Sequence, residues 1–118
     1  MFNILLLLVC ITELSAKHLH SERYYQEIFC NNIGGTMEVV LSDNTRVDCL
    51  TDKYAIEVDF ANKWAEGIGQ SLHYGLMTSK KAGVYLIIES AKDYKYIDRV
   101  NAIANRHCIR IWHDKGIE

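Results

Sequence analysis

The stretch that decides the fold runs from Arg46 to Phe60 and reads RVDCLTDKYAIEVDF. Its second half alternates apolar and other side chains, as a strand with one apolar face does. Asp52 and Lys53 form a turn signal before that half, so the stretch predicts two antiparallel strands joined by a short loop. On the second strand one face carries Tyr54, Ile56, Val58 and Phe60, and the other carries Ala55, Glu57 and Asp59.

The sequence on either side of this hairpin supplies the other expected elements. We expect helices over 21–30, 62–79 and 94–107, and strands over 37–41, 46–51, 54–60, 83–89 and 108–112. This order predicts an α/β (α+β) fold with a mixed sheet and helices on its faces. The core-facing stripe expected on the longest helix consists of Trp64, Ala65, Ile68, Leu72 and Leu76.

The N-terminus carries an unbroken apolar run, ILLLLVCI, over residues 4–11. It is too short for a bilayer, which needs about 20 apolar residues. Its position favours a secretory signal peptide over residues 1–16, cleaved after Ala16, which leaves a single domain over 17–118. The alternative is a buried N-terminal strand or helix. We therefore expect a secreted or periplasmic protein without membrane contact after cleavage, or a cytoplasmic one if the segment is retained.

Composition and cysteine content narrow the function classes. The chain has 118 residues and a net charge of -2, which argues against nucleic-acid binding through bulk positive charge and leaves a local basic patch open. After cleavage Cys30, Cys49 and Cys108 remain, of which two could pair in an oxidising compartment while the third stays free. Each also lies in an apolar context, and we expect at least one of them to be a buried thiol. Their spacing does not support a zinc site.

The carboxylates of the central hairpin are its most informative feature. A two-residue loop places Asp48 opposite Glu57 and Arg46 opposite Asp59, with directly opposed Cβ atoms about 5 Å apart. Two like charges at that distance repel, and a divalent cation bound by oxygen ligands would relieve the repulsion. The alternatives are a solvated face with an Arg46–Asp59 ion pair, or a three-residue loop that puts the two carboxylates on opposite faces.

A polar stripe on the following helix has two interpretations. Lys63, Gly67, Gln70 and Tyr74 share one side at 100° per residue. This side is either a solvent face or a face beside the acidic residues. In the second case Lys63 would neutralise developing charge, and Gln70 and Tyr74 would hold a phosphate or a base.

Together these residues resemble the PD-(D/E)xK nuclease superfamily, most closely its RecB-type and junction-resolvase-like members. The family pattern places an acid on one strand, E-x-K or a variant on the next, and often Q-x-x-x-Y on the following helix. This chain has Asp48, then Glu57-Val58-Asp59, then Gln70 and Tyr74. The resemblance covers roughly residues 21–89. It implies a restriction-endonuclease-like αβββαβ core with a C-terminal αβ extension.

The resemblance also implies roles for single residues. Asp48 and Glu57 would bind Mg²⁺ (or Mn²⁺), joined by the Val58 carbonyl and a third acid, for which Glu22, Glu27 and Glu38 are candidates and Glu38 is preferred. Asp59 stands where the family has its lysine; either it acts as a ligand or general base, or Lys63 replaces the lysine. The catalytic set would be Asp48, Glu57, Asp59, Lys63 and Gln70, and the DNA contacts Arg46, Tyr74, Lys80 and Lys81.

The expected function is Mg²⁺-dependent hydrolysis of DNA phosphodiester bonds, by a protein that could act as a homodimer. One alternative is a catalytically inactive domain of the same fold that binds nucleic acid or protein, which the Asp59 substitution motivates. The other is a small secreted binding protein with one disulfide. The sequence leaves open DNA against RNA, endonucleolytic against exonucleolytic cutting, and sequence preference.

Overall fold

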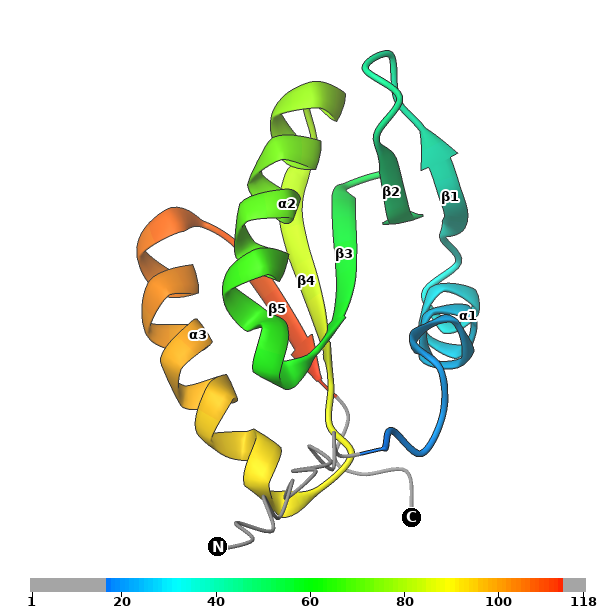
Figure 1. Ribbon diagram of the computed structural model, residues 1–118. Helices are drawn as coiled ribbons and strands as arrows, with labels where there is room; N and C mark the ends of the chain where they lie inside the picture. The colour runs from blue at the N-terminus through cyan, green and yellow to red at the C-terminus, as the bar shows by residue number, and fades with distance from the viewer. Residues whose placement is uncertain (1–16, 114–118) are drawn as a thin grey trace, which may run out of the picture.

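The structure is a computed structural model that describes residues 17–113, so the expected signal peptide over 1–16 lies outside the described residues. In chain order the elements are α1 (Glu22–Asn32), β1 (Thr36–Val40), β2 (Arg46–Leu50), β3 (Tyr54–Phe60), the short 3₁₀ helix η1 (Ala61–Lys63), α2 (Trp64–Thr78), β4 (Lys81–Ile87), a second 3₁₀ helix η2 (Ala91–Asp93), α3 (Tyr94–His107) and β5 (Arg110–His113) (Figure 1). Among these helices none is long and apolar enough to cross a membrane.

The five strands form one mixed sheet in the order β1-β2-β3-β4-β5. The pairs β1–β2 and β2–β3 are antiparallel, whereas β3–β4 and β4–β5 are parallel. Each parallel connection contains a helix, α2 or α3, as parallel neighbours require a long crossover. The mixed sheet and the element order predicted from the sequence are confirmed.

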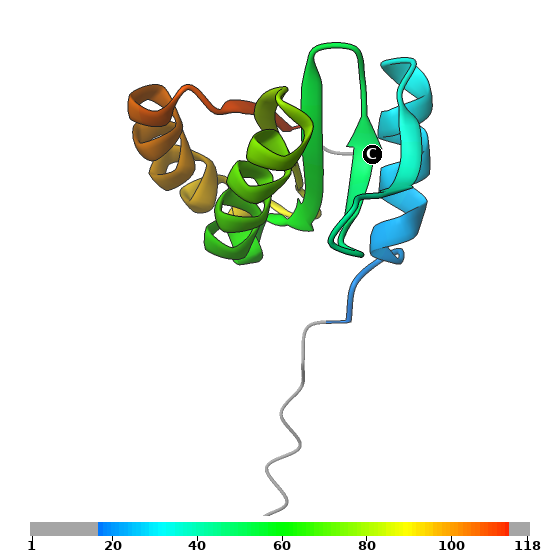
Figure 2. The same ribbon diagram turned by 90° about the horizontal axis from the view of Figure 1, so that it is seen from above.

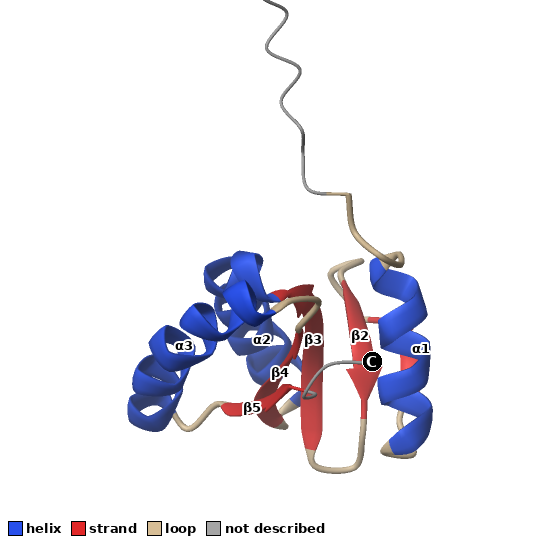
Figure 3. Ribbon diagram, turned by 90° about the horizontal axis from the view of Figure 1, so that it is seen from below, coloured by secondary structure: helices blue, strands red, loops and turns tan. Residues whose placement is uncertain are grey.

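Helices cover both faces of the sheet. The strands lie between α1 on one side and α2 and α3 on the other (Figures 2 and 3). Tyr25 and Phe29 of α1 pack with Ile56 and Val58 of β3 in one apolar cluster. A second cluster joins β4 to α3 on the opposite face through residues that include Val84, Leu86, Ile97, Val100 and Ala104. The architecture is therefore three layers, with the apolar face of β3 turned toward α1 as its alternation predicts.

The register of the central hairpin is the one that a two-residue loop requires. Cys49 pairs with Ile56 and Leu50 with Ala55, and the Thr51 amide donates to the Tyr54 carbonyl at 2.9 Å. Continued by one pair, this register sets Asp48 opposite Glu57. The three-residue loop is excluded.

The hairpin of β1 and β2 changes face in its middle. Met37 and Cys49, which are paired, pack in the cluster under α1, whereas the next pair, Val39 and Val47, packs with Tyr74 of α2. Between the two pairs Glu38 adopts a left-handed conformation with φ of 56°, which is unfavourable for a residue with a side chain. The change of face lets one part of the hairpin pack against α1 and the next part against α2.

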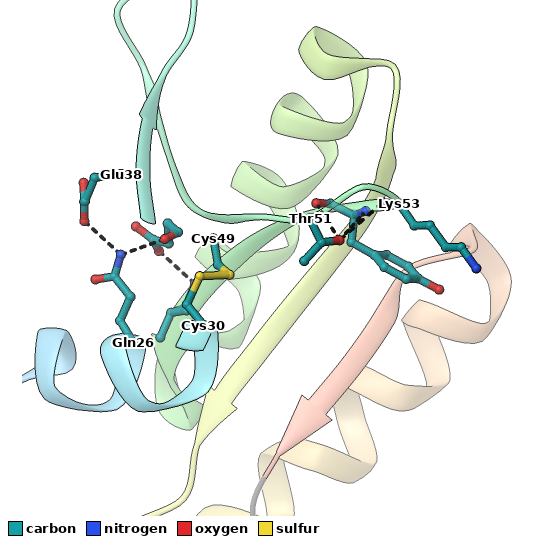
Figure 4. Close-up of a disulfide and its surroundings, with 9 residues drawn as sticks. Gln26, Cys30, Glu38, Cys49, Thr51 and Lys53 are labelled. Carbon is teal, nitrogen blue, oxygen red and sulfur yellow. Dashed lines mark hydrogen bonds between the residues drawn. A yellow bond between two sulfur atoms is a disulfide. The ribbon is translucent and has the colours of Figure 1, made fainter. Parts of the chain in front are cut away.

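Gln26 of α1 stabilises this unusual backbone. Its side chain is almost fully buried, and its Nε2 donates both to Glu38 Oε1 and to the Asp48 carbonyl, each at 2.9 Å (Figure 4). One amide thus joins the helix to both strands where they change face. Because the partners of a buried amide are costly to lose, this contact holds the middle of the hairpin in place.

A disulfide joins the same helix to the same strand. Cys30 of α1 and Cys49 of β2 are bonded, with their Cα atoms 5.7 Å apart, and Cys108 is a free, exposed thiol (Figure 4). A Cβ atom on Gly35 would collide with both sulfur atoms, so that position needs glycine. One pair and one free cysteine were among the arrangements expected, and a disulfide is compatible with an extracellular protein.

The orientation predicted for α2 is wrong. Leu72 is 44% exposed and Leu76 79% exposed, although Trp64 and Ile68 do pack in part against the core. The buried positions are Gly67, Ser71, Tyr74 and Gly75. The helix lies so close to the sheet that a Cβ on Gly75 would come within 3.0 Å of the Lys80 carbonyl oxygen. Close approach selects small residues for the interface, and a search for large apolar residues misses them.

Removal of the disulfide tests the attachment of α1. We expect the double substitution of Cys30 and Cys49 by Ala to lower the free energy of unfolding by about 2–4 kcal/mol, since the cross-link restricts the unfolded chain. Urea denaturation measures the change, with Cys108→Ser as the matched control that leaves stability unaltered. Equal stability of the double variant and the non-reduced wild type would contradict the attachment.

Candidate active site

The candidate site lies where β2 and β3 separate. Beyond the pair Cys49–Ile56, the Asp48 side chain takes the place of a backbone acceptor, since its Oδ2 accepts the Val58 amide at 2.8 Å. Glu57 and Asp59 extend from β3 toward α2 and are each only 5% exposed. Neighbouring strands thus bring three carboxyl groups together in a largely water-free position.

The carboxyl groups of Asp48 and Glu57 lie close enough for a hydrogen bond between them. Two carboxyl groups make such a bond only if one of them keeps a proton. Burial raises the pKa of both groups, and the charge of Asp48 raises that of Glu57 further. Glu57 Oε2 is buried without a hydrogen-bond partner among residues 17–113. The predicted proximity of the two carboxylates is therefore observed.

Asp59 is the second carboxylate with an unsatisfied oxygen. Its Oδ2 is buried without a hydrogen-bond partner in the described chain, and it lies 3.2 Å from the position that a Cβ on Gly67 would occupy. Burial, followed by the charge of Glu22, raises the pKa of Asp59 to about 7, and the Lys63 ammonium opposes this shift. Arg46 does not pair with it: its Nη1 lies 3.8 Å from Glu38 Oε2 instead. The prediction of an Arg46–Asp59 ion pair is therefore wrong.

Among the three candidates for the additional acid, Glu22 is the one whose charge interacts with all three carboxyl groups. Burial and then the charge of Asp48 raise its pKa, and Glu22 in turn raises the pKa of both Glu57 and Asp59. Glu38, the preferred candidate, lies opposite Asp48 but is held by Gln26 and Arg46. Glu27 is paired with Arg23 at 3.1 Å on the exposed side of α1.

Half of the polar stripe of α2 faces the sheet. Its interpretation as a solvent face is therefore wrong for Gly67 and Tyr74. Gly67 and Tyr74 are buried, and the Tyr74 hydroxyl donates to Gln70 Oε1 at 3.1 Å. Burial, followed by the charges of Glu57 and Asp48, raises the pKa of Tyr74 to about 12. Gln70 itself is exposed, as is Lys63 at the start of the helix. The stripe therefore borders the carboxyl groups.

Two predicted DNA contacts lie elsewhere. Lys80 Nζ donates to the Thr51 carbonyl at 2.5 Å, and Lys81 begins β4 opposite Tyr54. Both belong to the end of the sheet where β3 begins, whereas Asp59 lies where β3 ends. The structure brings together Asp48, Glu57, Asp59, Lys63, Gln70 and Tyr74, and it places Lys80 and Lys81 apart from them.

Sequence reasoning overlooked Gln26 and underrated Glu22. Both lie on the same side of α1, four residues apart, and this spacing was the available signal. Among residues 17–113, no group of three or more His, Cys, Asp or Glu side chains is arranged closely enough to hold a metal ion. Comparison with family models, curated proteins and solved structures finds no match to this chain.

The buried carboxyl groups make stability depend on pH. The pKa of Asp59 in the folded state, about 7, exceeds its ordinary value, so between about pH 4 and pH 7 the folded state holds more protons than the unfolded state. Stability must therefore fall as pH rises through that range. In EDTA at pH 8 we expect Asp59→Asn to raise the free energy of unfolding by at least about 1 kcal/mol.

Urea denaturation of wild type and variant at pH 5 and pH 8 measures this effect. Asp98→Asn, which removes an exposed carboxylate on α3, is the matched control and should change little. A variant less stable than wild type at pH 8 would show that the Asp59 charge is favourable in the fold.

Proposed function

We propose that this protein is a Mg²⁺-dependent nuclease that hydrolyses DNA phosphodiester bonds, and that its fold is a restriction-endonuclease-like core with a C-terminal extension. The observation that carries the proposal is the pair Asp48 and Glu57. Their carboxyl groups come from neighbouring strands and lie close enough to share a proton, and a buried oxygen of Glu57 has no partner among the described residues. Bringing these carboxyl groups together destabilises the folded state, and a cation bound between them would offset that effect.

The oxygen donors of Asp48 and Glu57 suit a hard divalent cation. Mg²⁺ is commonly held by one or two carboxylates and by water, so it does not need the group of three side chains that is absent among residues 17–113. The available donors are carboxylate oxygens, the type that Mg²⁺ and Mn²⁺ prefer, and the unsatisfied Glu57 Oε2 is one of them. Asp48 and Glu57 would hold the ion, and Glu22 is better placed than Glu38 to assist. Such an ion lowers the pKa of a bound water and stabilises charge that develops on a phosphate. Binding would displace the shared proton.

The surrounding side chains supply the remaining chemistry. Asp59, with a pKa of about 7, is suited to accept a proton from the attacking water near neutral pH. Lys63 is the cation whose charge acts on both Asp59 and Glu22, and it takes the part of the lysine that the motif lacks. Because Tyr74 donates to the Gln70 carbonyl oxygen, the Gln70 amino group remains a donor for a phosphate oxygen.

A cavity of about 610 Å³ beside the end of β3 offers the substrate an approach. Its lining includes Asn62, which directly precedes Lys63, and the charged residues Lys17, Lys92, Lys95, Glu89 and Asp93. Lysines near an acidic cluster are suited to hold backbone phosphates, which position a nucleic acid without reading its sequence. In a chain whose net charge is negative, these three lysines are the groups on this cavity that would contact DNA phosphates.

Substitution of Asp48 tests the metal site and the activity together. Asp48→Asn retains an oxygen that can accept the Val58 amide and removes the charge, so the fold is preserved. We expect wild type to cleave plasmid DNA with Mg²⁺ or Mn²⁺, and the cleavage rate of the variant to be at least about 100-fold lower. Substitution of a residue that only supports a metal ligand typically costs about 10- to 100-fold, so a direct ligand should cost at least the upper value.

The same proteins, melted with and without Mn²⁺, report binding independently of activity. Wild type and Asp98→Asn should gain melting temperature with metal, more at pH 8 than at pH 6 because binding displaces a proton, and Asp48→Asn should not. A metal-dependent shift without cleavage would favour an inactive binding domain of this fold. Absence of a shift in wild type would contradict the metal site.

Lys63 provides a separate test of the catalytic arrangement. We expect Lys63→Met to lower kcat by roughly 100-fold, since one preorganised electrostatic contact to a developing charge contributes about that much. The metal-dependent melting shift should remain. Arg106→Met, at the exposed end of α3, is the control with the same loss of charge. An unchanged kcat in Lys63→Met would remove this lysine from the mechanism.

A further inference from the structure

A second cavity, of about 530 Å³, opens at the opposite end of the sheet. It lies where β3 begins, between the end of α1 and the first residues of β5, and its lining includes Gly34, Thr51, Tyr54 and Arg110. The proposed active site leaves this cavity unused, and two of the lysines first expected to contact DNA lie at or beside it.

The cavity is separate from the acidic site. Tyr54 points to the α1 side of the sheet with Ile56, whereas Glu57 points to the α2 side. Glu57 follows Tyr54 by three residues, which is about 10 Å along an extended strand. A ligand in the cavity therefore does not touch the carboxyl groups of Glu57 and Asp59, and occupancy of the two sites can be measured separately.

The lining is positively charged in a chain that is negative overall. Of the residues that the structure describes, Lys53, Lys80 and Arg110 are the cations that line the cavity, and Asp52 is the one acidic residue. Lys81 adds a fourth cation at its edge, since its charge, with that of Lys53, acts on the Tyr54 hydroxyl. Three cations against one anion favour an anionic ligand, and the turn at Asp52-Lys53 presents exposed side chains toward it.

Aromatic rings form the second part of the lining. The rings of Tyr54 and Trp112 meet edge to face, with centroids 5.1 Å apart. The Arg110 guanidinium lies 4.7 Å from the Trp112 centroid and 5.5 Å from that of Tyr54. Gly83 lies beneath Trp112, where a Cβ would come within 2.6 Å of the indole. The indole is thus seated on the sheet, with a planar cation over it.

We propose that this cavity binds a nucleoside phosphate, either as a free nucleotide or as one unit of a single strand. A planar base can stack on the Trp112–Arg110 surface, as bases do on aromatic rings and guanidinium planes. The phosphate is then within reach of lysines on the rim, of which Lys53 is exposed. A simple anion would make no stacking contact with the rings, and a neutral aromatic ligand would make no ion pair with the cations.

Nuclear magnetic resonance titration of the ¹⁵N-labelled protein in EDTA tests the proposal with defined probes. Thymidine 5′-monophosphate should shift the amides of 51–53 and 110–112 and the Trp112 indole, with saturation. Deoxyribose 5-phosphate should bind about tenfold more weakly, since stacking of one base contributes about that much. Equal binding of the two, or shifts spread over the whole surface, would overturn the proposal.

Tetrathymidylate distinguishes the two sources of this ligand. Binding more than four times tighter than that of the mononucleotide identifies a single strand, because four equal units alone give only a fourfold statistical gain. A gain of fourfold or less identifies the free nucleotide. Failure of all three probes to shift the residues of the cavity would refute nucleotide binding there.

Matched variants assign the effect to the cavity. Arg110→Glu and Lys53→Glu change exposed residues and should each weaken thymidine monophosphate binding by about tenfold or more, as loss of a charge-assisted contact does. Arg99→Glu, with the same charge change on α3, should bind as wild type does, and so should Asp48→Asn, which makes the result independent of nuclease activity. Unaltered affinity in both cavity variants would overturn the proposal.

Discussion

The hydrogen bond from the Val58 amide to the Asp48 carboxylate is the contact on which the site depends. It satisfies a backbone donor that would otherwise pair with β2, and so allows the two central strands to separate without leaving a buried amide unpaired. The same contact directs the Asp48 carboxylate toward Glu57. A single side chain thus ends the ladder and begins the acidic site.

The acidic site destabilises the fold, and several neighbouring contacts offset its cost. Burial raises the pKa of Asp48, Glu57 and Asp59, and repulsion from neighbouring carboxylates raises that of Glu57 and Asp59 further, which means that the folded state resists their ionisation. The amide of Gln26 and the Cys30–Cys49 disulfide both fasten α1 to β2 beside these groups. Natural proteins retain unfavourable charge clusters chiefly where the charges have a use, and this is why the cluster carries the functional proposal.

Much of the fold could be predicted, because the signals were local. The alternation of Tyr54–Phe60 identified both faces of β3, and the Asp52-Lys53 turn placed the hairpin, while the pairing with β2 is the two-residue-loop register of the two that the turn allowed. The orientation of α2 could not be predicted in the same way. Leu72 and Leu76 suggested a core face, but the helix approaches the sheet through Gly67 and Gly75, whose small size becomes informative only when the neighbouring strand is in place.

The sequence by itself determined the element order and the two faces of β3, since each follows from residues within one element or turn. It left two registers for the central hairpin, and only the observed strand pairing decided that Asp48 lies opposite Glu57. The tertiary structure alone decided that Glu22 and Gln26 approach the hairpin, that Lys80 and Lys81 lie at the other end of the sheet, and that Tyr54, Arg110 and Trp112 meet in one cavity. These contacts join segments far apart in the chain. Their geometry depends on how helices pack on a twisted sheet, which no local pattern encodes.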